Sequence, residues 1–128
     1  MPKLGAVKLL GLRTVIYPAP DLAEMKRWWT ALLGQDPYFD QPFYVGYSVG
    51  GYELALDPNA SSEIGPVTYW GVEDVDRSVA EAVAAGATLF QDPIDVGGGI
   101  RVAAVRTPQG SLLGLIVNPH FDAESSGA

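Results

Sequence analysis

The pattern of apolar and polar positions at the start of the chain predicts a strand followed by a helix. Residues 9–17 are rich in aliphatic and β-branched side chains and end at prolines, as strands often do. Asp21 then stands where a helix N-cap is expected, with Glu24 three positions later as in a capping box. Apolar residues recur at helical spacing until Gly34, which supplies the C-terminal stop.

Residues 36–57 change to short aromatic and β-branched runs, which predict a meander of three strands. Prolines interrupt these runs, and Gly50-Gly51 marks a tight turn between two of the strands. A polar linker follows at residues 58–62. The first half of the chain therefore has the element order β-α-β-β-β.

The same order returns in the second half. Residues 67–72 predict a strand, Asp74 caps a second helix that ends at Gly86, and residues 88–118 predict three more strands. The repetition indicates a duplicated unit. The predicted organisation is two modules (about 9–57 and 66–118) within one α+β domain (1–121), followed by a small acidic tail that is expected to be disordered (122–128).

Length and composition narrow the possible functions. A chain of 128 residues is the usual size of one domain. Its net charge of −7 at pH 7 disfavours binding to nucleic acid or to an anionic membrane. The sequence has no cysteine, which excludes disulfides and thiolate chemistry. Its N-terminus does not form a signal peptide, so a cytoplasmic location is expected.

Three short motifs mark the two modules by their order and spacing. They are Asp21-Leu22 with Leu32-Leu33-Gly34, Glu73-Asp74-Val75-Asp76 with Ala84-Ala85-Gly86-Ala87, and Thr107-Pro108-Gln109-Gly110 before the last strand. In this arrangement the chain resembles the vicinal oxygen chelate superfamily over about residues 9–119. That superfamily includes glyoxalase I, extradiol dioxygenases, fosfomycin-resistance enzymes and bleomycin-binding resistance proteins.

The resemblance implies an α+β fold of two βαβββ modules in tandem, with mixed sheets curved into a cup and helices on the outside. It also implies a homodimer and a small ligand inside the cup. Enzymes of the family hold a metal on the first and last strands of each module, and these positions fall on Thr14, Glu53, Val67 and Gly114. Glu53 alone among them is a good metal ligand, so neither a metal nor another cofactor is expected.

The other candidate groups give little support for metal or triad chemistry. His120 is the sole histidine and lies beyond the last predicted strand, which favours a surface residue over a ligand. A Ser-His-Asp triad is excluded for the same reason. Gly97-Gly98-Gly99 lacks the helix and lysine of a phosphate-binding loop, and a hairpin or a mobile lid is expected there. Metal-dependent glyoxalase, dioxygenase or fosfomycin-transferase activity is therefore not expected.

Glu53 is the candidate for chemistry. Strand alternation puts Glu53 and Ala55 on one face, which would be the inside of the cup in the family's geometry. There the carboxylate could serve as a general acid or base, or pair with a cationic ligand. The alternative is a solvated glutamate on the open face of a sheet.

Aromatic and apolar residues supply the rest of the predicted site. Rings are dense between residues 38 and 47, where they could stack on a ligand or fill the core, whereas Trp70 is expected in the core. The predicted ligand contacts are Thr14, Ile16, Tyr44, Tyr47, Glu53, Val67, Tyr69, Leu112 and Gly114.

Two leading hypotheses for function remain open, beside a third in which the chain is a structural or partner-binding domain with no pocket large enough for a ligand. In the first, the protein binds a hydrophobic or aromatic small molecule without a metal and sequesters it, as an antibiotic-binding resistance protein does. In the second, it is a metal-free isomerase, lyase or cyclase that uses Glu53 as general acid or base.

Overall fold

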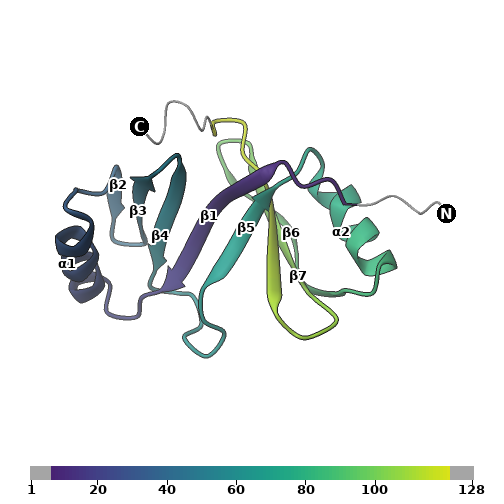
Figure 1. The fold of residues 1–128 in the computed structure, drawn as a ribbon, viewed down its shortest axis with the longest axis horizontal. Coiled ribbons are helices and arrows are strands. Elements are labelled where there is room, and N and C mark those ends of the chain that lie inside the picture. Colours follow the sequence, from purple (N-terminus) through teal and green to yellow (C-terminus); the bar gives the residue numbers. More distant parts are fainter. Residues whose placement is uncertain (1–6, 122–128) are drawn as a thin grey trace. The chain divides into compact units, whose positions relative to one another are not determined.

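The computed structural model describes residues 7–121, and its elements follow the order βαβββ twice (Figure 1). The tail of residues 122–128, predicted to be disordered, lies outside this range. Contacts group the chain into an N-terminal unit, Thr14–Val67, and a C-terminal unit, Thr68–Phe121 together with residues 7–13. The elements are β1 (Gly11–Pro18), α1 (Leu22–Leu33), β2 (Phe39–Gln41), β3 (Tyr44–Val49), β4 (Tyr52–Asp57), β5 (Val67–Gly71), α2 (Val75–Ala84), β6 (Thr88–Gly97), β7 (Ile100–Arg106) and β8 (Leu112–Val117).

In the N-terminal unit, four strands lie in the order β2-β3-β4-β1. Neighbouring strands β2, β3 and β4 are antiparallel, and β1 is parallel to β4 with Thr14 opposite Glu53. Helix α1 lies beside this sheet (Figure 1) and packs on a buried cluster. That cluster comprises Ala19, Val45, Tyr47 and Leu56.

The ends of α1 have the chemistry that the sequence predicts. The Asp21 carboxylate accepts a hydrogen bond of 3.1 Å from the backbone N–H of Glu24, although the Glu24 side chain pairs with Arg27. Gly34 closes the helix in the left-handed conformation, at φ 68°. Two glycines with positive φ, Gly50 and Gly51, turn the chain between β3 and β4. These local signals explain why the predicted boundaries of α1 are correct.

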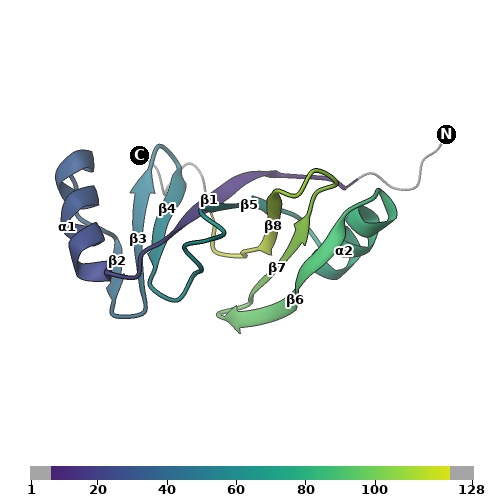
Figure 2. The same ribbon diagram turned by 90° about the horizontal axis from the view of Figure 1, so that it is seen from below.

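In the C-terminal unit, the strands lie in the order β5-β8-β7-β6, with β5 parallel to β8 and the other pairs antiparallel. Helix α2 runs along the strands of this unit (Figure 2) and contacts β6, β7 and β8. Its core comprises Val72, Val75, Ala103 and Leu115. Both units are therefore mixed sheets with one helix each, which confirms the predicted α+β fold of two βαβββ modules.

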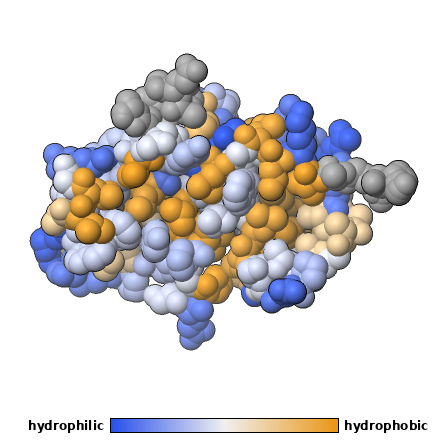
Figure 3. All heavy atoms as spheres, in the orientation of Figure 1, coloured by the Kyte–Doolittle hydropathy of each residue, from blue (hydrophilic) through white to orange (hydrophobic). Residues whose placement is uncertain are grey.

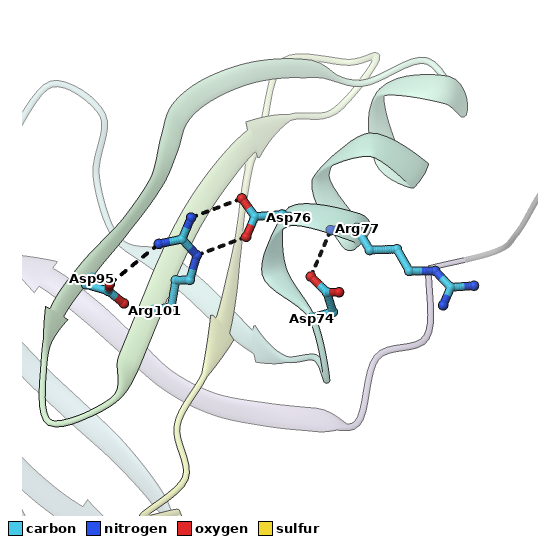
Figure 4. Close-up of polar contacts among 5 residues, drawn as sticks. All are labelled: Asp74, Asp76, Arg77, Asp95 and Arg101. Atoms are coloured by element: carbon cyan, nitrogen blue, oxygen red, sulfur yellow. Dashed lines mark hydrogen bonds and ion pairs between the residues drawn. The ribbon is translucent and has the colours of Figure 1, made fainter.

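Polar contacts fix α2 at its N-terminus (Figure 4). Asp74 caps the helix by accepting a hydrogen bond of 3.1 Å from the Arg77 backbone N–H. Asp76, in the first turn, accepts two bonds of 3.0 Å from the guanidinium of Arg101 on β7. Asp95 on β6 lies 3.7 Å from the same guanidinium. Arg101 therefore ties the helix to the adjacent hairpin.

Apolar side chains remain on the surface of the C-terminal unit. Figure 3 shows apolar side chains gathered over its strands. Strand β6, at the end of the strand order, exposes Leu89, Phe90, Ile94 and Val96. Within residues 7–121, neither helix has the length and hydropathy needed to cross a membrane.

Candidate functional site

Glu53 is the centre of a hydrogen-bond network in the N-terminal unit. Its Oε1 accepts a bond of 2.7 Å from the Thr14 hydroxyl and one of 2.8 Å from the Tyr44 phenol. Its Oε2 accepts a bond of 2.5 Å from the Tyr38 phenol. Three hydroxyl donors thus hold the carboxylate of the half-buried Glu53 in one position.

Strand register brings these groups together. Thr14 on β1 lies opposite Glu53 on β4, and Ser48 on β3 lies opposite Glu53 from the other side. Tyr38 precedes β2, and its backbone N–H donates to the carbonyl of Gly46 at 2.9 Å. The donors therefore come from three separate segments of the chain.

Gly46 provides the space that the carboxylate occupies. A Cβ at this position would fall 2.6 Å from Glu53 Oε2 and 3.1 Å from Tyr38 Cε1. Only glycine lets both side chains approach the strand so closely. Sequence reasoning missed Gly46 and the direct role of Tyr38. A glycine inside a strand pattern, two residues beyond Tyr44, was the signal for the first.

The electrostatics of the network keep its phenols protonated. Burial, followed by the negative charge of Glu53 and the hydrogen bond to it, raises the pKa of Tyr44 well above its usual value. Burial and the hydrogen bond to Glu53 likewise raise the pKa of Tyr38. Both phenols therefore remain hydrogen-bond donors throughout the physiological pH range.

Aromatic rings border the network. The Phe39 ring lies 6.1 Å from the Phe43 and Tyr44 rings and 6.5 Å from the Tyr38 ring, measured between centroids. Tyr38 is 63% exposed and Phe43 is 60% exposed. The predicted density of rings in this segment thus gives a partly open aromatic surface beside a fixed carboxylate.

Tyr47 does not belong to this surface, so its prediction as a ligand contact is wrong. The residue is fully buried against α1. Its hydroxyl bonds with Thr30 Oγ1 at 2.9 Å and donates to the Lys26 carbonyl at 3.1 Å. Tyr47 lies three positions after Tyr44 on β3, so strand alternation puts the two rings on opposite faces. Ile16, two positions from Thr14, is half-buried on the strand beside β4.

In the C-terminal unit, an aromatic ring stands where the N-terminal unit has its carboxylate. Tyr69 on β5 lies opposite Gly114 on β8, as Thr14 lies opposite Glu53. A Cβ at Gly114 would fall 2.6 Å from Cε2 of Tyr69, so the ring covers the glycine. The sequence offset matched Val67 with Thr14, whereas the residue that the register places opposite Gly114 is Tyr69. Leu112 lies opposite Arg106 on β7.

Three further predictions fall in the C-terminal unit. Gly98 and Gly99, with φ of 64° and 82°, form the hairpin turn between β6 and β7, so the glycine run is a hairpin. His120 contacts this turn through Nε2, 2.7 Å from the Gly98 carbonyl oxygen. Trp70 is half-buried, and its indole N–H donates to Thr68 Oγ1 at 3.3 Å.

The side chains at the family's metal-binding positions do not fit the metal that enzymes of the vicinal oxygen chelate superfamily carry. Register places Thr14 opposite Glu53 and Tyr69 opposite Gly114, and Glu53 alone among these is a common metal ligand. Among residues 7–121, no group of three or more His, Cys, Asp or Glu side chains could hold an ion. The groups that the described residues supply at this site are a carboxylate, hydroxyls and rings.

Comparison with known families agrees with this architecture. Residues 11–115 match the Glyoxalase/Bleomycin resistance protein/Dioxygenase superfamily. The chain belongs to this superfamily. The match covers both βαβββ modules, including the strands of Glu53 and of Gly114. A comparison with curated protein sequences finds no match.

Solved structures share this fold at low sequence identity. Methylmalonyl-CoA epimerase from Streptomyces coelicolor, solved with 2-nitronate-propionyl-CoA, has 17% identity and a TM-score of 0.68, over 90% of this chain and 99% of that chain. The epimerase from Mycobacterium tuberculosis has 18% identity and a TM-score of 0.66, over 91% and 94%. A superfamily member from Vibrio splendidus has 19% identity and a TM-score of 0.62, over 83% and 97%.

Proposed function

We propose that this member of the glyoxalase superfamily is a metal-independent binding protein that sequesters a hydrophobic or aromatic small molecule, such as an antibiotic. The observation that carries the proposal is the fixed Glu53 carboxylate beside exposed aromatic rings. Rings bury the flat part of a ligand and attract cations through their faces. A ligand that presents a cationic group to Glu53 fits this chemistry, as does the net charge of −7.

The network supports binding because the protein's own hydroxyl groups hold the carboxylate in one orientation. Thr14 and Tyr44 hold Oε1, and Tyr38 holds Oε2. A preorganised charge loses little conformational entropy when the ligand arrives. Tyr38, the most exposed of the donors, would cover the bound group.

A pair of isosteric probes tests this proposal. Trimethylphenylammonium and tert-butylbenzene have nearly the same shape and differ in charge, and binding is measured from chemical shifts of the ring protons of residues 38–44. We expect the cation to bind roughly tenfold more tightly, since a cation–π contact and one charge pair contribute about 1–2 kcal/mol. Glu53→Gln should remove most of the preference, whereas Asp40→Asn, a matched loss of charge on β2, should retain it. Equal binding of both probes to the native protein would contradict the role of Glu53.

The alternative is a metal-free enzyme in which Glu53 is the general acid or base. Its support is that Glu53 lies in hydrogen-bond contact with two phenols, and that fold neighbours include methylmalonyl-CoA epimerases, which are enzymes. Proton abstraction beside a carbonyl needs one carboxylate and hydrogen-bond donors, and no metal ligand beyond them.

Deuterium exchange separates the two functions. Incubation of the protein with methylmalonyl-CoA in D₂O would introduce deuterium next to the carbonyl if Glu53 removes that proton. Glu53→Gln should then slow exchange by roughly 10²–10⁴-fold. If exchange is no faster than in a buffer control, methylmalonyl-CoA loses its support as a substrate. The binding function would then be the hypothesis that remains.

A homodimer is also proposed. Its support within the described residues is the edge strand β6, which has β7 on one side and exposes Ile94 and Val96, at 49% and 57%. Long apolar edge strands promote association unless they are covered.

A further inference from the structure

The C-terminal unit holds one arginine in an unusual setting. The Arg13 guanidinium lies against the backbone of β5, where a Cβ at Gly71 would fall 2.6 Å from Nε and 2.7 Å from Cζ. A Cβ at Gly11 would fall 3.3 Å from Nη1. The Phe121 ring contacts the same group, with its centroid 4.2 Å from Cζ. Two glycines and one ring therefore fix the orientation of this guanidinium.

These contacts orient the guanidinium through backbone and a ring rather than through an acidic side chain. No carboxylate of residues 7–121 forms an ion pair with Arg13. By contrast, Arg101 pairs with Asp76 and Asp95 (Figure 4), Arg77 with Glu81, and Arg27 with Glu24. Arg106 donates to the Gly110 carbonyl at 2.8 Å. Among the guanidinium groups of residues 7–121, the half-buried Arg13 is the exception, because none of these polar partners accompanies it.

The chemistry of a stacked guanidinium identifies what it would bind. Its N–H donors lie in one plane and point outward from its edge, while glycine backbone and a phenyl ring contact the group. A planar fork of this kind matches two oxygens of a carboxylate or phosphoryl group in a bidentate pair.

We propose that Arg13, held by Gly71 and Phe121, is a binding site for an oxyanion group of a small molecule, either a carboxylate or a phosphoryl group. The site lies in the C-terminal unit and takes the opposite charge from the group assigned to Glu53, so it is independent of the proposed function. Gly71 and Phe121 are positioning residues, and Arg13 supplies the contact.

Direct observation of the arginine tests the site. The Nε–H resonances of uniformly ¹⁵N-labelled protein are followed while sodium benzoate or inorganic phosphate is added at constant ionic strength, with chloride as the reference. We expect a saturable shift of the Arg13 resonance with benzoate, phosphate or both. Benzoate alone would assign a carboxylate, and phosphate alone a phosphoryl group. No saturable shift with either probe overturns the proposal, and this result needs no variant.

Matched variants then locate the contact. Arg13→Met should weaken binding by about tenfold or more, because it removes a charge-assisted bidentate pair. Arg77→Met removes the same charge from an exposed position on α2 and should leave binding unchanged. Gly71→Ala retains Arg13 but places a Cβ where the guanidinium lies, so it should also weaken binding. Equal affinity of the Arg13→Met and native proteins would show that the anion binds elsewhere and would overturn the assignment.

Discussion

Glu53 illustrates how a single residue can take its character from its neighbours. Thr14, Tyr38 and Tyr44 all donate to its carboxylate, and Gly46 makes room for it. The coupling also acts in the other direction, because the negative charge and burial make both phenols harder to ionise. The network therefore depends on alkaline pH through its two phenols, whereas an isolated surface glutamate has no group that titrates in that range.

The first prediction at this scale concerns alkaline pH. A tyrosine in the unfolded chain releases its proton near pH 10, whereas the folded pKa of Tyr38 and Tyr44 is higher. Above about pH 10 the unfolded state therefore binds fewer protons than the folded state, and the free energy of unfolding falls as pH rises. The stability from these two phenols is present below pH 10 and is lost through the alkaline range.

Urea unfolding between neutral and alkaline pH, followed with tyrosinate absorbance, measures this loss. In the native protein, Tyr38 and Tyr44 should ionise only when the chain unfolds, so part of the tyrosinate absorbance should appear together with unfolding. The double variant Tyr38→Phe with Tyr44→Phe should be less stable at neutral pH but should decline less steeply in alkali. Glu53→Gln should also flatten the decline, because it removes the charge that disfavours ionisation. An identical slope in all three proteins would contradict the network.

Among the elements, α2 is attached to its sheet by both an apolar face and a charged pair. Val75 anchors the core side, and Asp76 pairs with Arg101 on β7. The hydrogen bonds from Arg101 lower the pKa of Asp76 below its ordinary value of 3.8. This pair is exposed to solvent, so its contribution to stability is small and is screened by salt.

We therefore expect a modest acid dependence that belongs to this element. The folded pKa of Asp76 is lower than the unfolded value, so its stabilising effect is present above about pH 3.8 and is lost as pH falls through the folded pKa. Asp76→Asn should raise the midpoint pH of acid unfolding slightly at low salt and have no such effect at high salt. Asp95→Asn removes the more distant carboxylate, 3.7 Å from Arg101, and should raise the midpoint pH of acid unfolding by less. A larger effect from Asp95→Asn would contradict the assignment.

The elements were predictable to the extent that their signals are local. Asp21 and Asp74 cap the helices as the sequence predicts, and Gly34 ends the first. What the sequence did not settle was the face and register of side chains. Tyr47 is buried against α1, and Tyr69 rather than Val67 lies opposite Gly114. Register depends on which strands pair, and a shift of one or two residues changes every neighbour.

The candidate site was predictable only in part, because it also depends on strand register and on residues outside the strands. Glu53 and Thr14 follow from family positions, and the register places them opposite each other. Tyr38 contributes a hydrogen bond from outside the regular strands, so alternation could not assign its direction. Gly46 acts through the absence of a side chain, which a search for reactive groups does not detect.

For the whole molecule, the proposed homodimer can be measured directly. Native mass spectrometry of the purified protein should give the mass of two chains, and it would also reveal any bound metal or small molecule carried from the cell. Ile94→Lys with Val96→Lys places charges on the exposed β6 edge and should yield a monomer. Val83→Lys on α2, at 44% exposure, is the matched control and should leave the dimer intact. A native protein of one chain mass would rule out the dimer.

The tyrosine that covers Gly114 also limits how this chain could change over time. A carboxylate at position 114, the family position that corresponds to Glu53, cannot be gained by one substitution, because even its Cβ would overlap the Tyr69 ring. Tyr69 would first have to be replaced, and that step alone would leave a hole over a glycine in β8. The route toward a second acidic group therefore passes through a less stable intermediate, and the asymmetry between the two modules resists reversal by single mutations.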